Sequence, residues 1–163
     1  ASLGLPVPRY VAAFIDGIGR IAGTVYVVFF GDEFLGQFQG FLITLGVPIA
    51  AWAGIFLADT IIRKKGYAEK ELYTATGRYG SWRWLPIALL VIGSVVGWGF
   101  VTNTYADWLA WQGYFMDAIG GKEGAWAFAN LGVLFSLLIG FLGYLAFGRA
   151  AVKKQESTPL DND

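Results

Sequence analysis

The chain has 163 residues, of which 56% are hydrophobic and 15% charged, and its formal net charge is zero. So high an apolar fraction excludes a disordered chain, and the lack of a basic surplus argues against a nucleic-acid-binding protein. Cys and His are absent from the sequence, which excludes disulfides, thiolate or imidazole metal sites, and Ser-His or Cys-His catalysis. The composition indicates an integral membrane protein.

Four apolar stretches are long enough to cross a bilayer, which takes about 20 residues. A strand of a membrane β-barrel is about half as long and alternates in hydrophobicity, whereas a helix satisfies its own backbone groups. The sequence therefore predicts an all-α integral membrane fold with four transmembrane helices, over residues 11–30, 34–58, 85–102 and 125–147.

Basic residues lie almost entirely on one side of these spans, where ten are found against Lys122 alone on the other side. By the positive-inside rule both ends are cytoplasmic, in a multi-pass protein of the cell membrane. The predicted segments are a cytoplasmic lead-in (1–10), a transmembrane hairpin (11–58), a basic cytoplasmic loop (59–84), spans three and four with an aromatic outer loop at 103–124 (85–147), and a cytoplasmic tail (148–163).

Asp16 and Arg20 are the charged residues inside the first span, four positions apart on one helix face. Arg20 lies roughly 15 Å along the helix from Tyr10, near the bilayer centre. Two interpretations are open: an ion or proton relay, or a mutually neutralised pair that ties the first span to its neighbours. Opposite charges at this spacing already neutralise each other, which favours the second.

Small residues recur every four positions on the later spans. This spacing lets helix backbones approach closely, which is the main packing device in lipid. It therefore predicts close helix contacts at Gly46, Ala50, Gly54 and Ala58 on span two, Gly93 and Gly97 on span three, and Gly132, Ser136 and Gly140 on span four.

The second span combines aromatic residues in its first half with Pro48 midway. Proline removes a backbone hydrogen bond and permits a bend, so this helix is either a flexible gate over a polar cavity or a kinked packing helix. At its end, Asp59 and Arg63 are spaced for an ion pair. The chain offers no plausible catalytic constellation, so we expect neither an enzyme nor a metal site.

The second span and the loop after it resemble the nucleobase–cation symporter family, the purine/cytosine permease-like transporters. In that family a Phe- and Leu-rich helix with Gly and Pro leads to Ala-Asp-aromatic, a basic cluster, Leu-Tyr, Gly-x-Tyr and Asn-Trp. Two positions depart from the pattern, Thr60 for an aromatic residue and Arg83 for Asn. The matching residues are Phe34 to Phe38, Leu45 to Pro48, Gly54 to Asp59, Arg63 to Lys65, Leu72-Tyr73, Gly77 to Tyr79, and Trp84.

The resemblance implies helices nine to twelve of a twelve-helix, five-plus-five inverted-repeat transporter that works by alternating access. Its partners would be the bilayer, a nucleobase and the remaining N-terminal helices, with H⁺ or Na⁺ as coupling ion and no cofactor. A start at Ala1, with Met116 as the single methionine, also leads us to expect a piece of a longer chain. The second span would be a substrate gate, with Phe38, Phe41, Leu42, Leu45 and Pro48 as its candidate residues.

One rival interpretation belongs to another class of protein. A complete small membrane protein of four helices, acting as an accessory or assembly subunit, would have the same composition and topology. The coding sequence upstream of Ala1 discriminates between the two, because the transporter predicts eight further hydrophobic spans there.

Overall fold

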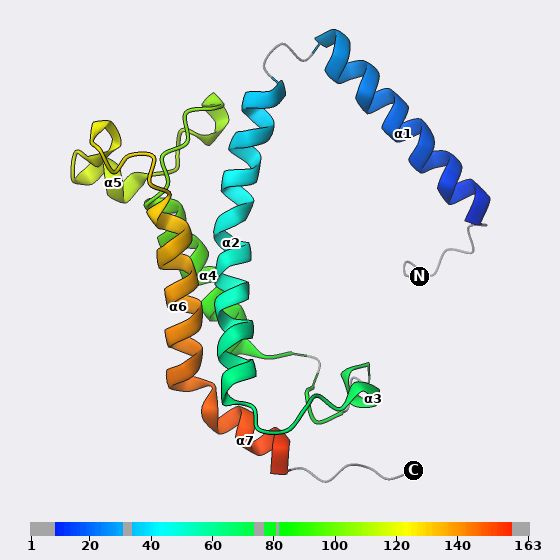
Figure 1. Ribbon diagram of the computed structural model, residues 1–163, viewed down its shortest axis with the longest axis vertical. Helices are drawn as coiled ribbons and strands as arrows, with labels where there is room; N and C mark the ends of the chain where they lie inside the picture. The colour runs from blue at the N-terminus through cyan, green and yellow to red at the C-terminus, as the bar shows by residue number, and fades with distance from the viewer. Residues whose placement is uncertain (1–8, 31–33, 74–76, 81, 158–163) are drawn as a thin grey trace. The chain divides into compact units, whose positions relative to one another are not determined.

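The computed structural model describes residues 9–30, 34–73, 77–80 and 82–157, and over these ranges the chain is helical with no strand (Figure 1). The chain divides into two compact units, residues 1–39 and residues 40–163. The first unit holds α1 (Arg9–Phe30) and the start of α2 (Phe34–Ile62), which continues through the second unit.

Helix α1 is long and apolar enough to cross a membrane over Tyr10–Phe29. Its 22 residues rise about 33 Å, more than the hydrocarbon thickness of a bilayer. A Cβ added at Gly17, Gly19 or Gly23 would meet no described atom within 4 Å. Within the first unit, the glycines of α1 therefore have no close neighbour.

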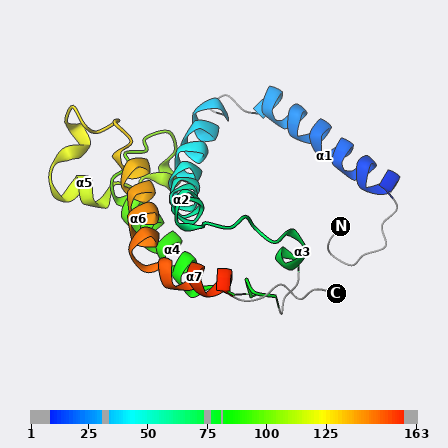
Figure 2. The same ribbon diagram turned by 60° about the horizontal axis from the view of Figure 1, so that its bottom comes forward.

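The second unit is built on α2, α4 (Trp84–Gly99) and α6 (Leu131–Phe147), which lie side by side in both views (Figures 1 and 2). Several of their glycines face backbone of a neighbouring helix. A Cβ at Gly54 would lie 2.3 Å from the Leu137 carbonyl oxygen, and one at Gly140 would lie 2.3 Å from that of Ala51. A Cβ at Gly132 would lie 2.1 Å from the Gly97 carbonyl oxygen. The predicted small-residue contacts are thus confirmed at these positions, and larger residues would force the helices apart.

Two of the predicted spans are shorter as helices than the sequence suggests. Helix α4 ends at Gly99, and α6 begins only at Leu131, after Asn130 in a left-handed conformation with φ of 50°. Helix α6 is followed, after a bend of 56°, by α7 (Arg149–Ser157). Within the described residues, two helices are long and apolar enough to span a membrane, or three if α6 and α7 count as one broken span. An all-helical chain with helices long and apolar enough to span a membrane is confirmed over the described residues, but four complete spans are not.

The ends of the predicted spans three and four that lie beyond α4 and α6 are apolar but not part of these helices. Residues 101–130 hold only three short helices: η1 (Asp107–Leu109), α5 (Tyr114–Ala118) and η2 (Gly121–Glu123). Aromatic side chains attach this segment to α4. Trp111 meets Trp98 edge-on at 5.5 Å between ring centroids, and Phe115 lies 5.2 Å from Phe100.

Candidate functional site

The last turn of α2 carries a buried ion pair between Asp59 and Arg63. Arg63 Nε and Nη2 donate to Asp59 Oδ2 at 3.0 and 2.9 Å, and Nη2 also reaches Oδ1 at 3.2 Å. The spacing of four residues brings the two side chains together on one helix face. Only 5% of the Arg63 side chain and 10% of the Asp59 side chain is exposed. A buried charge pair must satisfy its remaining hydrogen-bonding groups to be stable.

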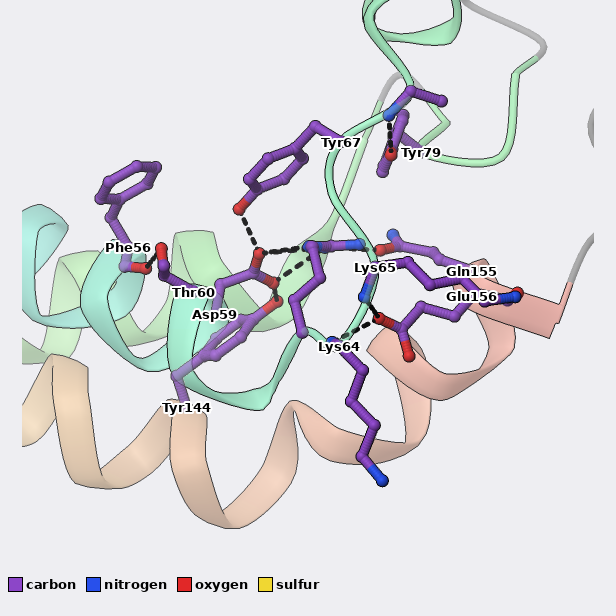
Figure 3. A network of polar contacts seen from close by, with 12 residues as sticks. Phe56, Asp59, Thr60, Lys64, Lys65, Tyr67, Tyr79, Tyr144, Gln155 and Glu156 are labelled. Carbon is purple, nitrogen blue, oxygen red and sulfur yellow. Dashed lines mark hydrogen bonds and ion pairs between the residues drawn. The ribbon is translucent and has the colours of Figure 1, made fainter.

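Three further side chains supply these additional hydrogen bonds (Figure 3). The Tyr67 and Tyr144 hydroxyls both donate to the Asp59 carboxylate, Tyr144 at 2.7 Å. On the other side of the pair, Arg63 Nη2 donates to Gln155 Oε1 at 3.0 Å. We call Asp59, Arg63, Tyr67, Tyr144 and Gln155 the Asp59 cluster. It joins the end of α2 to the following loop, to α6 and to α7.

The guanidinium of Arg63 also stacks on aromatic rings of the loop. Its central carbon lies 4.4 Å from the centroid of the Tyr67 ring and 5.6 Å from that of Tyr79. Burial raises the pKa of Tyr67, and the hydrogen bond to Asp59 raises it further. Tyr67 is therefore a neutral donor to the carboxylate at physiological pH.

Glu156 of α7 holds the chain where α2 ends. Its Oε1 accepts hydrogen bonds from the backbone N–H groups of Lys64 and Lys65 at 2.6 and 2.7 Å (Figure 3). Lys65 Nζ in turn donates to the Glu156 carbonyl at 3.1 Å. A single carboxylate thus binds two backbone donors that follow the last turn of α2.

The basic loop between α2 and α4 contains the short helix α3 (Glu69–Leu72) and an ion pair of its own. Arg78 donates to Glu71 Oε2 through its Nε at 2.8 Å and its backbone N–H at 3.1 Å. These hydrogen bonds from Arg78, the side-chain bond above all, lower the pKa of Glu71. The Tyr79 hydroxyl accepts from the Ala68 N–H at 2.9 Å. These hydrogen bonds join residues 68–71 of the loop to residues 78–79.

A cavity of about 390 Å³ lies beside the Asp59 cluster. One part of its wall is polar and includes Asp59, Arg63 and Arg83. The rest is mainly apolar, from α2 and α4, and includes Trp52, Phe56, Pro86, Ile87 and Leu90. The cavity can accept a ligand that is charged at one end and apolar along its length.

A second polar network surrounds the carbonyl that Pro48 leaves without a partner. In a regular helix the N–H of residue 48 would bond the Thr44 carbonyl, and proline has no N–H. Trp98 of α4 replaces that donor, with its indole Nε1 at 2.9 Å from the Thr44 carbonyl oxygen. Nearby, Gln112 Nε2 donates to Thr44 Oγ1 at 2.7 Å, and Asn103 Nδ2 donates to the Gly40 carbonyl at 2.9 Å. The missing backbone bond in α2 is thus replaced by the Trp98 indole, and the loop after α4 adds hydrogen bonds to the Thr44 hydroxyl and the Gly40 carbonyl.

The predicted gate residues lie on α2, and most are on its exposed face. Phe41, Leu42 and Leu45 are 43%, 50% and 38% exposed, whereas the residues one helix face away, such as Val47 and Ala51, are fully buried. Pro48 is half-buried between the two faces. Phe38 belongs to the first unit, where its ring stacks on Phe34. Their role as a gate stays a prediction.

In the first unit, Asp16 and Arg20 of α1 form an ion pair with each other. Arg20 Nε donates to Asp16 Oδ2 at 2.8 Å, and Thr24 Oγ1 donates to the Arg20 carbonyl. The two side chains are 63% and 79% exposed. Neither a relay nor a tie to a neighbouring helix is tested by this geometry.

Sequence reasoning missed the tyrosines and the glutamine of the Asp59 cluster. Tyr144 lies in a strongly apolar helix and is 1% exposed, so its hydroxyl needs a partner. A buried tyrosine in such a helix is a usable signal, but its partner, 85 positions away, is not readable from spacing. Within the described residues, no group of three or more His, Cys, Asp and Glu is placed to hold a metal ion.

No protein-family profile, curated protein or solved structure matches the chain.

Proposed function

We propose that the chain is the C-terminal part of a secondary active transporter that imports a nucleobase together with H⁺ or Na⁺. Alternating access would carry the substrate across the cell membrane, with both ends of this segment in the cytoplasm. The observation that carries the proposal is the family-like run of residues from Gly54 to Lys65. Three residues of this run have specific structural roles. Gly54 allows close contact with the backbone of α6, and Asp59 and Arg63 form the buried ion pair of the Asp59 cluster.

The arrangement of α2 is compatible with gating. One face of the helix is held by α4 and α6, while Phe41, Leu42 and Leu45 on the other face are exposed. In the complete transporter this face would meet the remaining helices and the substrate pathway. Pro48 lies between the two halves of α2, where proline allows a helix to bend.

A substitution in the full-length transporter tests the gating role. Leu45→Trp adds bulk on the proposed cavity face and should lower nucleobase uptake or shift its apparent affinity. Leu57→Trp is the matched control, because Leu57 is also exposed on α2, at 49%, but lies near the C-terminal end of the helix, away from Leu45. Unchanged uptake and affinity for Leu45→Trp, or an equal loss for both variants, would contradict a gate at this position.

The alternative is a complete small membrane protein that serves as an accessory or assembly subunit. The second unit favours it in one respect, since α2, α4 and α6 hold together by direct backbone contacts. Eight further hydrophobic spans encoded upstream of Ala1 would decide for the transporter. Transport by the 163-residue chain alone in proteoliposomes would contradict the fragment interpretation.

A further inference from the structure

The cavity beside the Asp59 cluster, which we call the groove, is lined mainly by α2, α4 and the loop between them. Its apolar wall is formed partly by residues that are exposed on the helices, such as Trp52 at 59% and Phe56 at 49%. Trp52 and Phe56 stack on each other at 5.7 Å between ring centroids. In a bilayer these side chains face lipid tails rather than water, since both lie in the candidate span Phe34–Ile62.

The polar end of the groove carries an excess of positive charge. Asp59 and Arg63 neutralise each other within the Asp59 cluster. Arg83 lines the same groove, and no described carboxylate lies within ion-pair distance of it. Its guanidinium carbon instead lies 6.0 Å from the centroid of the Tyr144 ring. The charge of the groove as a whole therefore favours an anion.

The surroundings place this polar end at the level of lipid headgroups. Residues 63–83 contain six basic and two acidic residues. Trp82 and Trp84, on either side of Arg83, are 70% and 72% exposed and pack against each other. Exposed tryptophans and basic residues at a helix end are typical of the membrane–water interface.

We propose that this groove binds an anionic phospholipid. The phosphate is held by Arg83 at the polar end, and one acyl chain lies along Trp52, Phe56, Ile87 and Leu90 between α2 and α4. Basic pockets between membrane helices are known to select acidic headgroups in this way. The proposal needs α2 and α4 in a membrane with Trp52 and Phe56 facing lipid. It therefore goes with the accessory-subunit alternative, because in the complete transporter this face of α2, which also carries Leu45, would meet other helices.

The test measures which lipids the purified chain retains. The full chain is reconstituted in nanodiscs with equal parts of phosphatidylglycerol and phosphatidylcholine, transferred to detergent, and examined by native mass spectrometry. We expect phosphatidylglycerol to be retained in preference to phosphatidylcholine. Arg83→Gln should lower that preference about fivefold, the change that one cation near an acidic headgroup produces, and Arg83→Lys should largely keep it.

A matched control separates this groove from a second basic cavity. Lys153 lines a cavity of about 520 Å³ with Lys64 and Arg149 along α7. Lys153→Gln removes the same charge from the same end of the molecule and should leave the preference unchanged. A loss with Lys153→Gln but not with Arg83→Gln would place the lipid in the second cavity and overturn the proposal.

The apolar half of the groove has a test that leaves all charges in place. Ile87→Trp fills the groove and should lower phosphatidylglycerol retention as Arg83→Gln does. Val91→Trp, one turn further along α4 at a position that is 54% exposed, should not. Equal retention of the two lipids, or a chain that retains neither and stays paired with a second copy, would contradict a phospholipid site.

Discussion

The same sequence pattern, an aspartate followed four residues later by an arginine, occurs in α1 and at the end of α2. Both pairs form, with Nε-to-carboxylate distances of 2.8 and 3.0 Å. Their environments are opposite. The Asp16–Arg20 side chains are mostly exposed, whereas the Asp59–Arg63 side chains are buried and share Tyr67, Tyr144 and Gln155.

The difference teaches that local spacing decides pairing but not the energy of the pair. Where water surrounds a pair, screening limits its contribution to about 0–1 kcal/mol, whereas Asp16 and Arg20 lie in a candidate membrane span, in which lipid or other helices would replace that water. In a buried pair, loss of one partner leaves an uncompensated charge, which costs about 3–5 kcal/mol. The glycines of the two helices follow the same division, since those of α1 face open space and Gly54 of α2 faces backbone.

The largest effect is expected from Asp59→Asn. It leaves the Arg63 guanidinium buried without a countercharge, so the free energy of unfolding should fall by about 3–5 kcal/mol. The measurement is unfolding of the purified chain in micelles by dodecyl sulfate, followed by circular dichroism. Asp16→Asn, in the exposed pair of α1, should lower the same quantity by less than Asp59→Asn does. An equal loss in the two variants would show that the exposed and the buried pair contribute equally to stability.

The next effect concerns helix packing. Gly140→Ala places a methyl group 2.3 Å from the Ala51 carbonyl oxygen, and the three nearest atoms all belong to the Ala51 backbone. Overpacking of this kind should destabilise the second unit by about 2 kcal/mol in the same unfolding assay. Gly19→Ala, in open space on α1, should leave stability unchanged or raise it by up to about 1 kcal/mol, because alanine favours helix. A destabilising Gly19→Ala would mean that α1 is closely packed.

Removing one hydrogen bond of the Asp59 cluster should have a smaller effect. Tyr144→Phe takes away the hydroxyl that donates to Asp59 Oδ1 at 2.7 Å. A hydrogen bond to a charged group is worth about 1.5 kcal/mol or somewhat more, and unfolding should become easier by that amount. Tyr10→Phe, at a position that is 75% exposed on α1, is the control and should have no effect. A null result for Tyr144→Phe would show that the carboxylate does not depend on this donor.

The smallest effect lies in the loop pair of Arg78 and Glu71, where 8% and 20% of the two side chains are exposed. Because the native pKa of Glu71 is below its ordinary 4.5, the pair contributes fully above pH 4.5 and is lost as the pH falls through the lower native value. The Arg78 amide resonance should therefore titrate with a midpoint below 4.5, and Glu71→Gln should abolish this titration. Glu69→Gln should leave it intact, and a midpoint at or above 4.5 would refute the pairing.

The helices and their contacts follow largely from the sequence. Gly54, Gly97, Gly132 and Gly140 step at helical spacing, and each meets backbone of a neighbouring helix. The helix ends at Gly99 and Leu131 could not be placed, because the apolar pattern runs on through residues that are not helical. Within the Asp59 cluster the local pair with Arg63 was predictable. Tyr144 and Gln155 were not, since their positions depend on how α6 and α7 pack against α2.

Pro48 and Trp98 together decide how α2 can bend. The Thr44 carbonyl is already bonded to the Trp98 indole, so any movement that carries Thr44 away from α4 must first break that bond. The break costs about 1 kcal/mol before any other contact changes. Bending at Pro48 that breaks this bond is therefore disfavoured about fivefold relative to bending that keeps it.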